Sequence, residues 1–139
     1  MDESKVKQCI FCDITNNITN SYKVWETENL FALLDITPMN PGHILVIPKI
    51  HYEDVYEMPS SLYTDLFIAI KKISPILKKV TSAKRIGLAI EGFGVAHVHI
   101  HLVPVNKGNE LNPERARHLP EKELQEMQKA LKDAFKDLK

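Results

Sequence analysis

The most informative segment of this chain is His97-Val98-His99-Ile100-His101-Leu102-Val103. Histidine alternates with an apolar residue, and alternate residues of a β-strand point to the same face of a sheet. We therefore expect a strand within Val95–Val105, with the apolar side chains toward the core and the three imidazoles on the opposite face. A buried imidazole needs polar partners, so three in a row indicate a functional site rather than packing.

Two kinds of chemistry fit three imidazoles on one strand face. A His-x-His pair is a common source of two metal ligands. Alternatively, a neutral imidazole can attack phosphorus, while its neighbours donate hydrogen bonds to phosphate oxygens or protonate a leaving group. The spacing alone does not choose between them.

The rest of the chain predicts an α+β domain with a mainly antiparallel sheet. Short apolar or β-branched runs indicate further strands at 22–26, 30–34, 43–47 and 86–90. A turn with two prolines and a glycine, Thr37–Gly42, joins the second strand to the third. Helical apolar spacing follows at Leu62, Leu66, Ile70, Ile73 and Leu77, and again from about Pro120.

Composition narrows the function classes. The chain has 139 residues, and Lys plus Arg equals Asp plus Glu at 18 each, so no net field favours nucleic acid or a membrane surface. Its N-terminus is polar and no run reaches the roughly 18 apolar residues of a membrane span, so a cytoplasmic protein is expected. Cys9 and Cys12 form a C-x-x-C pair, which in a reducing compartment indicates a metal half-site or a redox pair.

The histidine segment resembles the histidine triad (HIT) motif at every position. Upstream segments resemble the other blocks of that family in the same order, so the resemblance spans about residues 9–104: Cys9-Ile10-Phe11-Cys12, Leu33-Leu34-Asp35-Ile36-Thr37-Pro38 and Pro41-Gly42-His43-Ile44-Leu45-Val46-Ile47-Pro48-Lys49-Ile50-His51. It implies a five-stranded antiparallel sheet with two helices in a single domain over 1–139, which a loop and helix at about 106–139 complete. It also implies a twofold homodimer, in which the helix at 60–80 would be the contact; packing of that helix onto its own sheet would explain its apolar stripe equally.

The resemblance implies a hydrolase or nucleotidyl transferase. His99 would attack the α-phosphate of a nucleotide and form a covalent nucleotidyl-histidine, with no metal ion needed for the chemical step. His101 would contact the phosphate and stabilise its charge, beside His97 as the third catalytic imidazole. His43 would support the histidine strand by hydrogen bonding.

The expected ligand is a purine nucleotide or a nucleotide conjugate. Asp35 resembles the acidic residue that binds the ribose hydroxyls, although a turn aspartate would look the same. Gly94 and Val95 are expected at the nucleotide as well. The apolar residues that match or neighbour the base slot could equally be core: Ile10, Phe11, Ile14, Phe31, Leu33 and Leu45.

A structural zinc site is also implied. Cys9, Cys12, His51 and His97 resemble the Cys2His2 site of some family members and of the related hexose-1-phosphate uridylyltransferases. Two thiolates and two imidazoles suit tetrahedral zinc. The alternative is a pair of small buried cysteines beside two hydrogen-bonded histidines.

One segment departs from the family pattern. Many relatives carry Gly-Gln-Ser or Gly-Gln-Thr before the triad, whereas this chain reads Ile90-Glu91-Gly92-Phe93-Gly94-Val95-Ala96. We hypothesise that Glu91 partners a triad histidine or faces the leaving group, and that Gly92 and Gly94 offer backbone N–H groups. Replacing Glu91 with glutamine is then expected to change activity sharply.

Three functions remain open at this point. The first is an enzyme acting on nucleoside phosphoramidates, adenylylated conjugates or dinucleoside polyphosphates. The second is a nucleotide-binding adaptor with little turnover. The third is a metal enzyme that uses His-x-His as ligands, which a chelator would inhibit.

Overall fold

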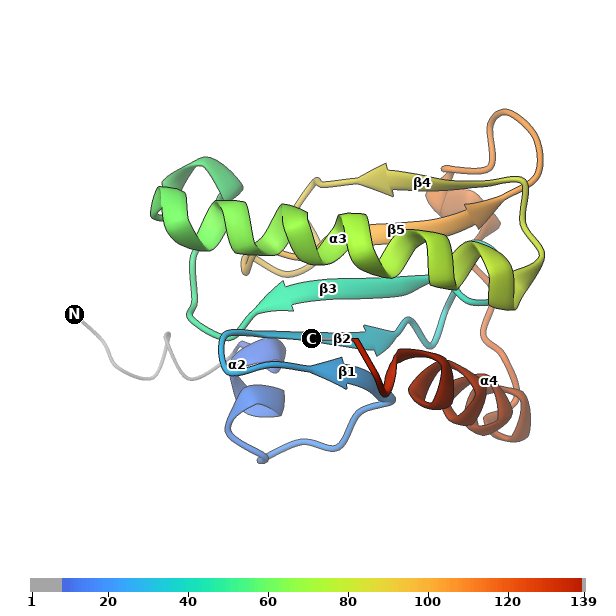
Figure 1. Cartoon of the computed structure of the whole chain (residues 1–139), viewed down its shortest axis with the longest axis horizontal. Coiled ribbons are helices and arrows are strands. Elements are labelled where there is room, and N and C mark those ends of the chain that lie inside the picture. Colours follow the sequence, from blue (N-terminus) through green and yellow to red (C-terminus); the bar gives the residue numbers. More distant parts are fainter. Residues whose placement is uncertain (1–8, 139) are drawn as a thin grey trace.

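Five strands form one sheet in the order β1-β2-β3-β5-β4 (Figure 1), in a computed structural model that describes residues 9–138. Every neighbouring pair is antiparallel, so the expected α+β fold is confirmed. The strands are β1 (Lys23–Glu26), β2 (Leu30–Leu34), β3 (Ile44–Pro48), β4 (Arg85–Ala89) and β5 (Ile100–Val105).

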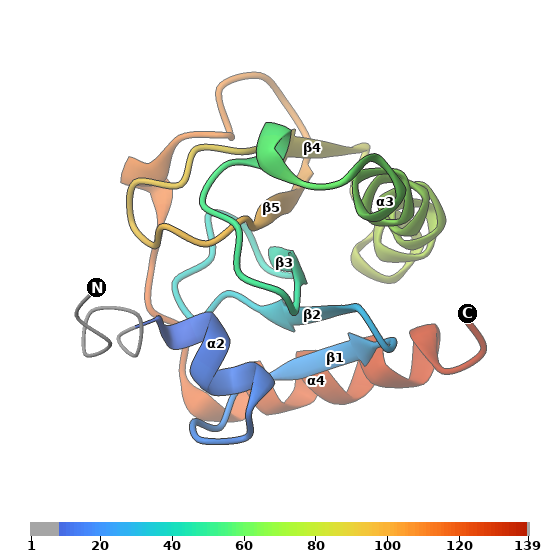
Figure 2. The same cartoon turned by 90° about the vertical axis from the view of Figure 1, so that its left-hand side faces the viewer.

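One face of the sheet is covered by the long helix α3 (Ser60–Thr81), which Figure 2 shows beside the sheet. Its predicted apolar stripe, from Leu62 to Leu77, is buried in the main core. Val98, Ile100 and Leu102 reach the same core from the other side. The stripe therefore packs α3 onto its own sheet. Large apolar residues outside the stripe, such as Tyr63 and Ile68, are exposed.

The opposite face carries the short helix α2 (Ile10–Thr15) and a smaller apolar cluster (Figure 2). This cluster joins α2 to alternate residues of β2 and β3, since side chains of a strand alternate between faces. Its buried members are Cys9, Phe11, Ile14, Phe31, Leu33, Leu45 and Ile47. The sheet thus separates a large structural core from a small one that borders the histidines.

The last helix, α4 (Glu121–Phe135), packs against β1 and α3. Leu124, Leu131 and Phe135 are its buried residues. Two single-turn 3-10 helices, Val55–Glu57 and Pro113–Arg115, complete the secondary structure of residues 9–138. Within the same residues, no helix combines the length and hydropathy that crossing a bilayer requires.

The histidine strand is shorter than predicted. A strand was expected within Val95–Val105, but β5 begins at Ile100. β4 ends at Ala89, which pairs with His101, so the ladder between these strands stops before residues 95–99. The Val98 amide instead donates to the carbonyl of Tyr52 at 2.8 Å. The predicted alternation of side chains nevertheless continues back to His97, because this segment stays beside the sheet.

Candidate functional site

The three imidazoles lie in a row on the α2 side of the sheet. The ring centroids of His99 and His101 are 5.0 Å apart. Phe11 of α2 packs edge-on against the other end of the row, 5.7 Å from the His97 centroid and 5.1 Å from that of His99. His97 and His99 are buried and His101 is half-buried, so each ring depends on specific polar partners.

The partner of His99 determines which of its nitrogens is free. Nδ1 of His99 lies 2.7 Å from the backbone carbonyl oxygen of His97. A carbonyl only accepts, so Nδ1 carries the proton and donates. In the neutral ring, Nε2 then holds an unshared electron pair. The fold therefore presents the central imidazole in the tautomer of a nucleophile.

A second set of bonds orients His101. The Met39 amide donates to Nδ1 of His43 at 3.1 Å, and Nε2 of His43 lies 2.9 Å from Nδ1 of His101. Since Nδ1 of His43 accepts, its Nε2 carries the proton and donates to His101. Nε2 of a neutral His101 is then an N–H donor. The chain Met39–His43–His101 therefore ends in a hydrogen-bond donor.

Burial favours the neutral form of the two imidazoles in this hydrogen-bonded series. It lowers the pKa of His43 to about 4, against the opposing attraction of Asp35. It also lowers the pKa of His101, with a smaller contribution from His99 in the same direction, while Asp35 and Glu91 raise it. His43 is therefore neutral near pH 7. A neutral ring is required here, because Nδ1 of His43 accepts from the Met39 amide.

Asp35 follows β2 and faces the same group. Its Oδ1 accepts from the Thr37 amide at 2.9 Å and the Thr37 hydroxyl at 3.1 Å. Its Oδ2 lies 3.6 Å from Nε2 of His43. These contacts hold a half-buried carboxylate at the edge of a cavity, with one oxygen left to accept from a ligand.

The cavity, of about 580 Å³, opens between α2 and the sheet beside Asp35. Most of the residues predicted for a base slot line it: Ile10, Phe11, Ile14, Leu33 and Leu45. Val95, which was expected at the nucleotide, lines it too. Phe31 does not; it is fully buried behind them in the small cluster, where Nζ of Lys23 lies 5.6 Å from its ring centroid. Gly94 is exposed and is not among the lining residues.

The sequence did not point to the polar rim of this cavity. That rim comes from the segment before β1 and from α4: Asn20, Ser21, Tyr22, Gln125 and Gln128. No motif marks these residues. Two elements more than 100 positions apart meet there only because α4 packs along β1, and a helical pattern does not say which neighbour a polar residue will face.

Glu91 lies near the row without a direct bond to it. Its side chain is exposed in the segment between β4 and β5. It acts on His101 through its charge, raising the pKa of that imidazole against the stronger effect of burial. The hypothesised role of Glu91 as partner of a triad histidine therefore rests only on this charge effect.

The other end of the row forms a second cluster. Cys9 Sγ lies 3.3 Å from Nδ1 of His97. Cys12 Sγ lies 3.4 Å from Nδ1 of His51 and 3.6 Å from Nδ1 of His97. All four candidate ligand atoms, those of Cys9, Cys12, His51 and His97, lie within 4.8 Å of one another. The fold thus gathers the four residues that the sequence suggested for zinc.

The donor set fits a tetrahedral zinc ion. Bonds of about 2.3 Å to sulfur and about 2.1 Å to nitrogen would separate sulfur from nitrogen by roughly 3.6 Å, close to the distances found. Nε2 of His97 donates to the Pro48 carbonyl at 2.7 Å, which leaves Nδ1 as a lone pair facing the thiols. Burial, together with Cys9, raises the pKa of Cys12 to about 11, so a cation is needed to hold it as a thiolate.

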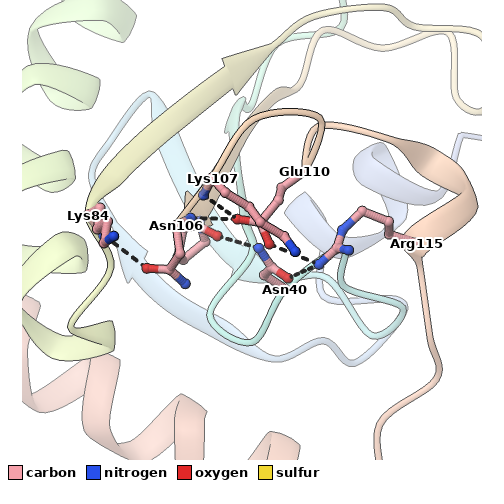
Figure 3. A network of polar contacts seen from close by, with 7 residues as sticks. Asn40, Lys84, Asn106, Lys107, Glu110 and Arg115 are labelled. Atoms are coloured by element: carbon pink, nitrogen blue, oxygen red, sulfur yellow. Dashed lines mark hydrogen bonds and ion pairs between the residues drawn. The ribbon is translucent and has the colours of Figure 1, made fainter.

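A polar network holds the turn between Asp35 and His43 (Figure 3). Asn40 donates to the Pro104 carbonyl at 2.8 Å and accepts from Arg115 at 2.7 Å. Arg115 also bridges to the buried Glu110 at 3.1 Å, and Glu110 accepts from the Lys107 amide at 3.0 Å. The turn is therefore tied to the end of β5 and to the segment after it.

The chain is similar in sequence to known proteins. Residues 16–108 match the HIT domain family. The chain is 38% identical over 121 residues to an uncharacterized HIT-like protein of Borreliella burgdorferi, covering 76% of this chain and 87% of that one. It is 36% identical over 97 residues to adenosine 5'-monophosphoramidase HNT1 of Saccharomyces cerevisiae, covering 69% and 61%. It is 31% identical over 101 residues to adenylylsulfatase HINT3 of Arabidopsis thaliana, covering 69% and 51%.

Solved structures share the fold. A Hit-like protein from Bartonella henselae superimposes with a TM-score of 0.80 at 29% identity, over 91% of this chain and 96% of that one. A zinc-bound histidine triad family protein from Mycobacterium smegmatis superimposes with a TM-score of 0.78 at 29% identity, over 94% and 95%. The expected five-stranded architecture is therefore shared with experimentally determined proteins.

Proposed function

The chain belongs to the HIT family, and we propose that it is a nucleotide hydrolase or nucleotidyl transferase in which His99 attacks the α-phosphate. The substrate would be a nucleoside phosphoramidate, an adenylylated conjugate or a dinucleoside polyphosphate. Relatives named as an adenosine monophosphoramidase and an adenylylsulfatase support hydrolysis of nucleotide conjugates. The whole chain would act as one domain.

The hydrogen bond from Nδ1 of His99 to the His97 carbonyl carries this proposal. It leaves the Nε2 lone pair free for attack. As Nε2 forms its bond to phosphorus, the bond from phosphorus to the leaving nitrogen or oxygen breaks, and the leaving atom takes a proton from solvent. The His97 carbonyl oxygen then stabilises the positive charge that develops on the nucleotidyl imidazole.

His101 would stabilise the phosphate. Its Nε2–H is the end of the chain that begins at the Met39 amide, and it would donate to a non-bridging phosphate oxygen as negative charge develops there. Glu91 would favour this donor through its charge. Asp35 would accept from the ribose hydroxyls, and the apolar wall around Phe11 and Leu45 would hold the base.

A second displacement would complete the cycle. Water, or another acceptor, attacks the same phosphorus, and the bond between phosphorus and Nε2 of His99 breaks. The attacking oxygen loses its proton to solvent, and the imidazole regains its lone pair. The nucleoside monophosphate, or the transferred nucleotidyl group, then leaves with the histidine as it began.

We further propose that Cys9, Cys12, His51 and His97 hold a structural zinc ion. The ion would fix α2 and the segment before β5 in place, and all four of its positions would be filled by protein. The distances between the donor atoms and the zinc-bound relative from Mycobacterium smegmatis support it. Zinc would take no part in the chemical step.

A homodimer is the proposed assembly. The apolar stripe of α3 is used inside the chain, but Tyr63 and Ile68 of that helix, Leu88 of the edge strand β4 and Ile90 just after it are exposed. An edge strand with exposed apolar residues favours pairing with another copy. Light scattering of the purified protein is expected to give twice the mass of one chain.

The function is tested with adenosine phosphoramidate and the variant His99→Ala. The wild type should release adenosine monophosphate, and rapid quenching should trap an adenylylated peptide that contains residue 99. The variant should lose roughly a thousandfold or more of the turnover and all of the adduct. An adaptor would bind the nucleotide without turnover in either protein, and undiminished cleavage by the variant would remove His99 from the mechanism.

A further inference from the structure

Helix α4 reaches the nucleotide cavity although it lies beyond residues 16–108, which match the HIT domain. Two of its side chains, Gln125 and Gln128, are on the cavity wall. We propose that Gln128 reads the base, by accepting a hydrogen bond from the exocyclic 6-amino group of adenine. This inference rests on the proposed function, because it takes the cavity as the site of a nucleotide base.

The amide of Gln128 is already oriented. Its Nε2 donates to the backbone carbonyl of Lys23 at 3.0 Å, next to the cavity residue Tyr22. An amide side chain has one donating and one accepting end. With the donating end held by backbone, Oε1 is the end left for a ligand, and it accepts no hydrogen bond from any of residues 9–138. Gln128 thus brings an unengaged acceptor to a residue of the cavity wall.

The position of Gln128 is rigid as well. It lies one turn from Leu124 and close to Leu131 on the face of α4 that packs against the rest of the chain, and both leucines are buried. The side chain itself is half-buried. An oriented acceptor loses little entropy when a ligand binds, so its hydrogen bond contributes to discrimination between bases rather than to ordering the protein.

Under the proposed function the base would occupy the cavity that Gln128 also lines. Phosphate at His99 and ribose at Asp35 define one end, and the apolar wall from Phe11 to Leu45 holds the ring faces. An apolar wall grips any base and distinguishes bases weakly. Polar atoms at the rim distinguish them, because the 6-amino group of adenine donates whereas the 6-oxo group of hypoxanthine only accepts. The 6-oxo group of hypoxanthine would face Oε1 of Gln128 without a hydrogen bond, because both atoms are acceptors.

Gln125 provides a matched control on the same helix. It also lines the cavity, but its side chain is exposed and its Nε2 donates to Glu121 at 3.2 Å instead of to the backbone of the cavity wall. A mobile, solvated amide contributes little to selectivity. The same substitution at the two positions therefore separates an oriented acceptor from a glutamine that is merely near.

The test measures binding of adenosine and inosine 5'-monophosphates by calorimetry, to the wild type, Gln128→Met and Gln125→Met. The wild type should bind the adenosine compound roughly fivefold to tenfold more tightly. Gln128→Met should bring the ratio close to one, and Gln125→Met should leave it unchanged. Gln128→Lys replaces the acceptor with a donor and should invert the preference, which keeps the test valid if the methionine variant does not fold.

Binding and turnover distinguish the two proposals. Selective binding that depends on Gln128, with no turnover of any phosphoramidate, would support this inference and reject the enzyme. Turnover with an unselective wild type, or with selectivity that survives in both Gln128 variants, would reject the inference and leave the enzyme intact. Failure of both nucleotides to bind the wild type would overturn the assignment of the cavity to the base.

Discussion

The two ends of the histidine row each bring histidines together with other potential metal ligands, but the hydrogen bonds at the two ends differ. At one end, Asp35, His43 and His101 gather side chains whose donors and acceptors alternate: Met39 amide to His43, His43 to His101. At the other end, Cys9, Cys12, His51 and His97 bring two thiols and two imidazoles together. In each group the candidate ligand atoms lie within 4.8 Å of one another. Both groups have the residue types of a metal site, and both flank His99.

The difference lies in where the protons are. In the Asp35–His43–His101 group, the Nδ1 lone pair of His43 accepts from the Met39 amide, and that of His101 accepts from Nε2–H of His43. These hydrogen bonds are complete without a metal ion. In the Cys9–Cys12–His51–His97 group, the proton of His97 is directed to the Pro48 carbonyl, and the remaining lone pair converges with the sulfurs. Neutral thiols can meet such nitrogen lone pairs with their S–H groups, whereas a zinc ion would replace both S–H protons and bind all four atoms. Residue types alone therefore do not identify a metal site; the nitrogen lone pair of His97 that faces the sulfurs makes this group the candidate.

The largest effect should come from the cysteine end. The double variant Cys9→Ser, Cys12→Ser removes both thiolates, which supply much of the affinity of such a site. The bound zinc should fall from about one ion per chain to none, as measured by atomic absorption. The melting temperature should drop by roughly ten degrees or more, because a structural metal contributes directly to folding.

A chelator provides the control for that experiment. Prolonged treatment of the wild type with a strong chelator should reproduce the lowered melting temperature, and added zinc should reverse it. If the double variant keeps the wild-type metal content, or melts at the same temperature, the converging lone pairs do not hold a metal.

The opposite end should affect activity and not metal content. His43→Ala removes the donor that orients His101, and turnover of adenosine phosphoramidate should fall about tenfold to a hundredfold. Zinc content should stay at the wild-type value. His118→Ala is the matched control, since His118 is an exposed histidine and should leave turnover unchanged. Loss of zinc in His43→Ala would mean that the two ends are not separate.

The neutral state of His43 should be visible in the pH dependence of stability. Burial lowers its folded pKa from 6.5 to about 4, so between these values the unfolded chain binds the proton more tightly. Its contribution to stability is therefore full above pH 6.5 and is lost as the pH falls toward 4. Urea unfolding at about pH 7 and about pH 5 should show a steeper decline for the wild type than for His43→Gln, by at most about 1.4 kcal/mol per pH unit. Equal slopes would contradict the buried neutral ring.

The smallest effect should come from Glu91. The side chain is exposed and acts on His101 only through its charge, so Glu91→Gln should lower turnover by roughly twofold to fivefold. The effect should shrink in high salt, because an exposed charge is screened. This is weaker than the sharp change expected from the sequence. A loss above a hundredfold, insensitive to salt, would indicate direct contact with the substrate instead.

Much of the fold was predictable because it follows from periodicity. The stripe from Leu62 to Leu77 has the spacing of a helix that packs on one side, and α3 does so. Alternation around His99 assigned the histidines and their apolar neighbours to opposite faces. The extent of the strand was not predictable, because hydrogen bonding at residues 95–99 depends on where β4 ends.

The site, like the fold, has features that the sequence predicted and features that depend on packing. Its residue types were evident from motifs, including the four residues of the Cys9–Cys12–His51–His97 group. Phe31 illustrates the limit: it belongs to an apolar run like Leu33, yet it is buried behind the cavity that Leu33 lines. Both point to the same face, and only the packing of α2 over that face separates the wall from what lies beneath it.

Sequence alone determined the elements, the row of imidazoles and the family, because these depend on local spacing and on residue identity. The tertiary structure decided the proton on each ring and the role of α4. A tautomer depends on which carbonyl or amide lies opposite a nitrogen. For His99 that partner is the nearby carbonyl of His97, but for the other two rings it comes from a distant part of the chain: Pro48 for His97, and Met39, through His43, for His101. Gln128 meets the cavity for the same reason, since only packing brings residue 128 to the carbonyl of residue 23.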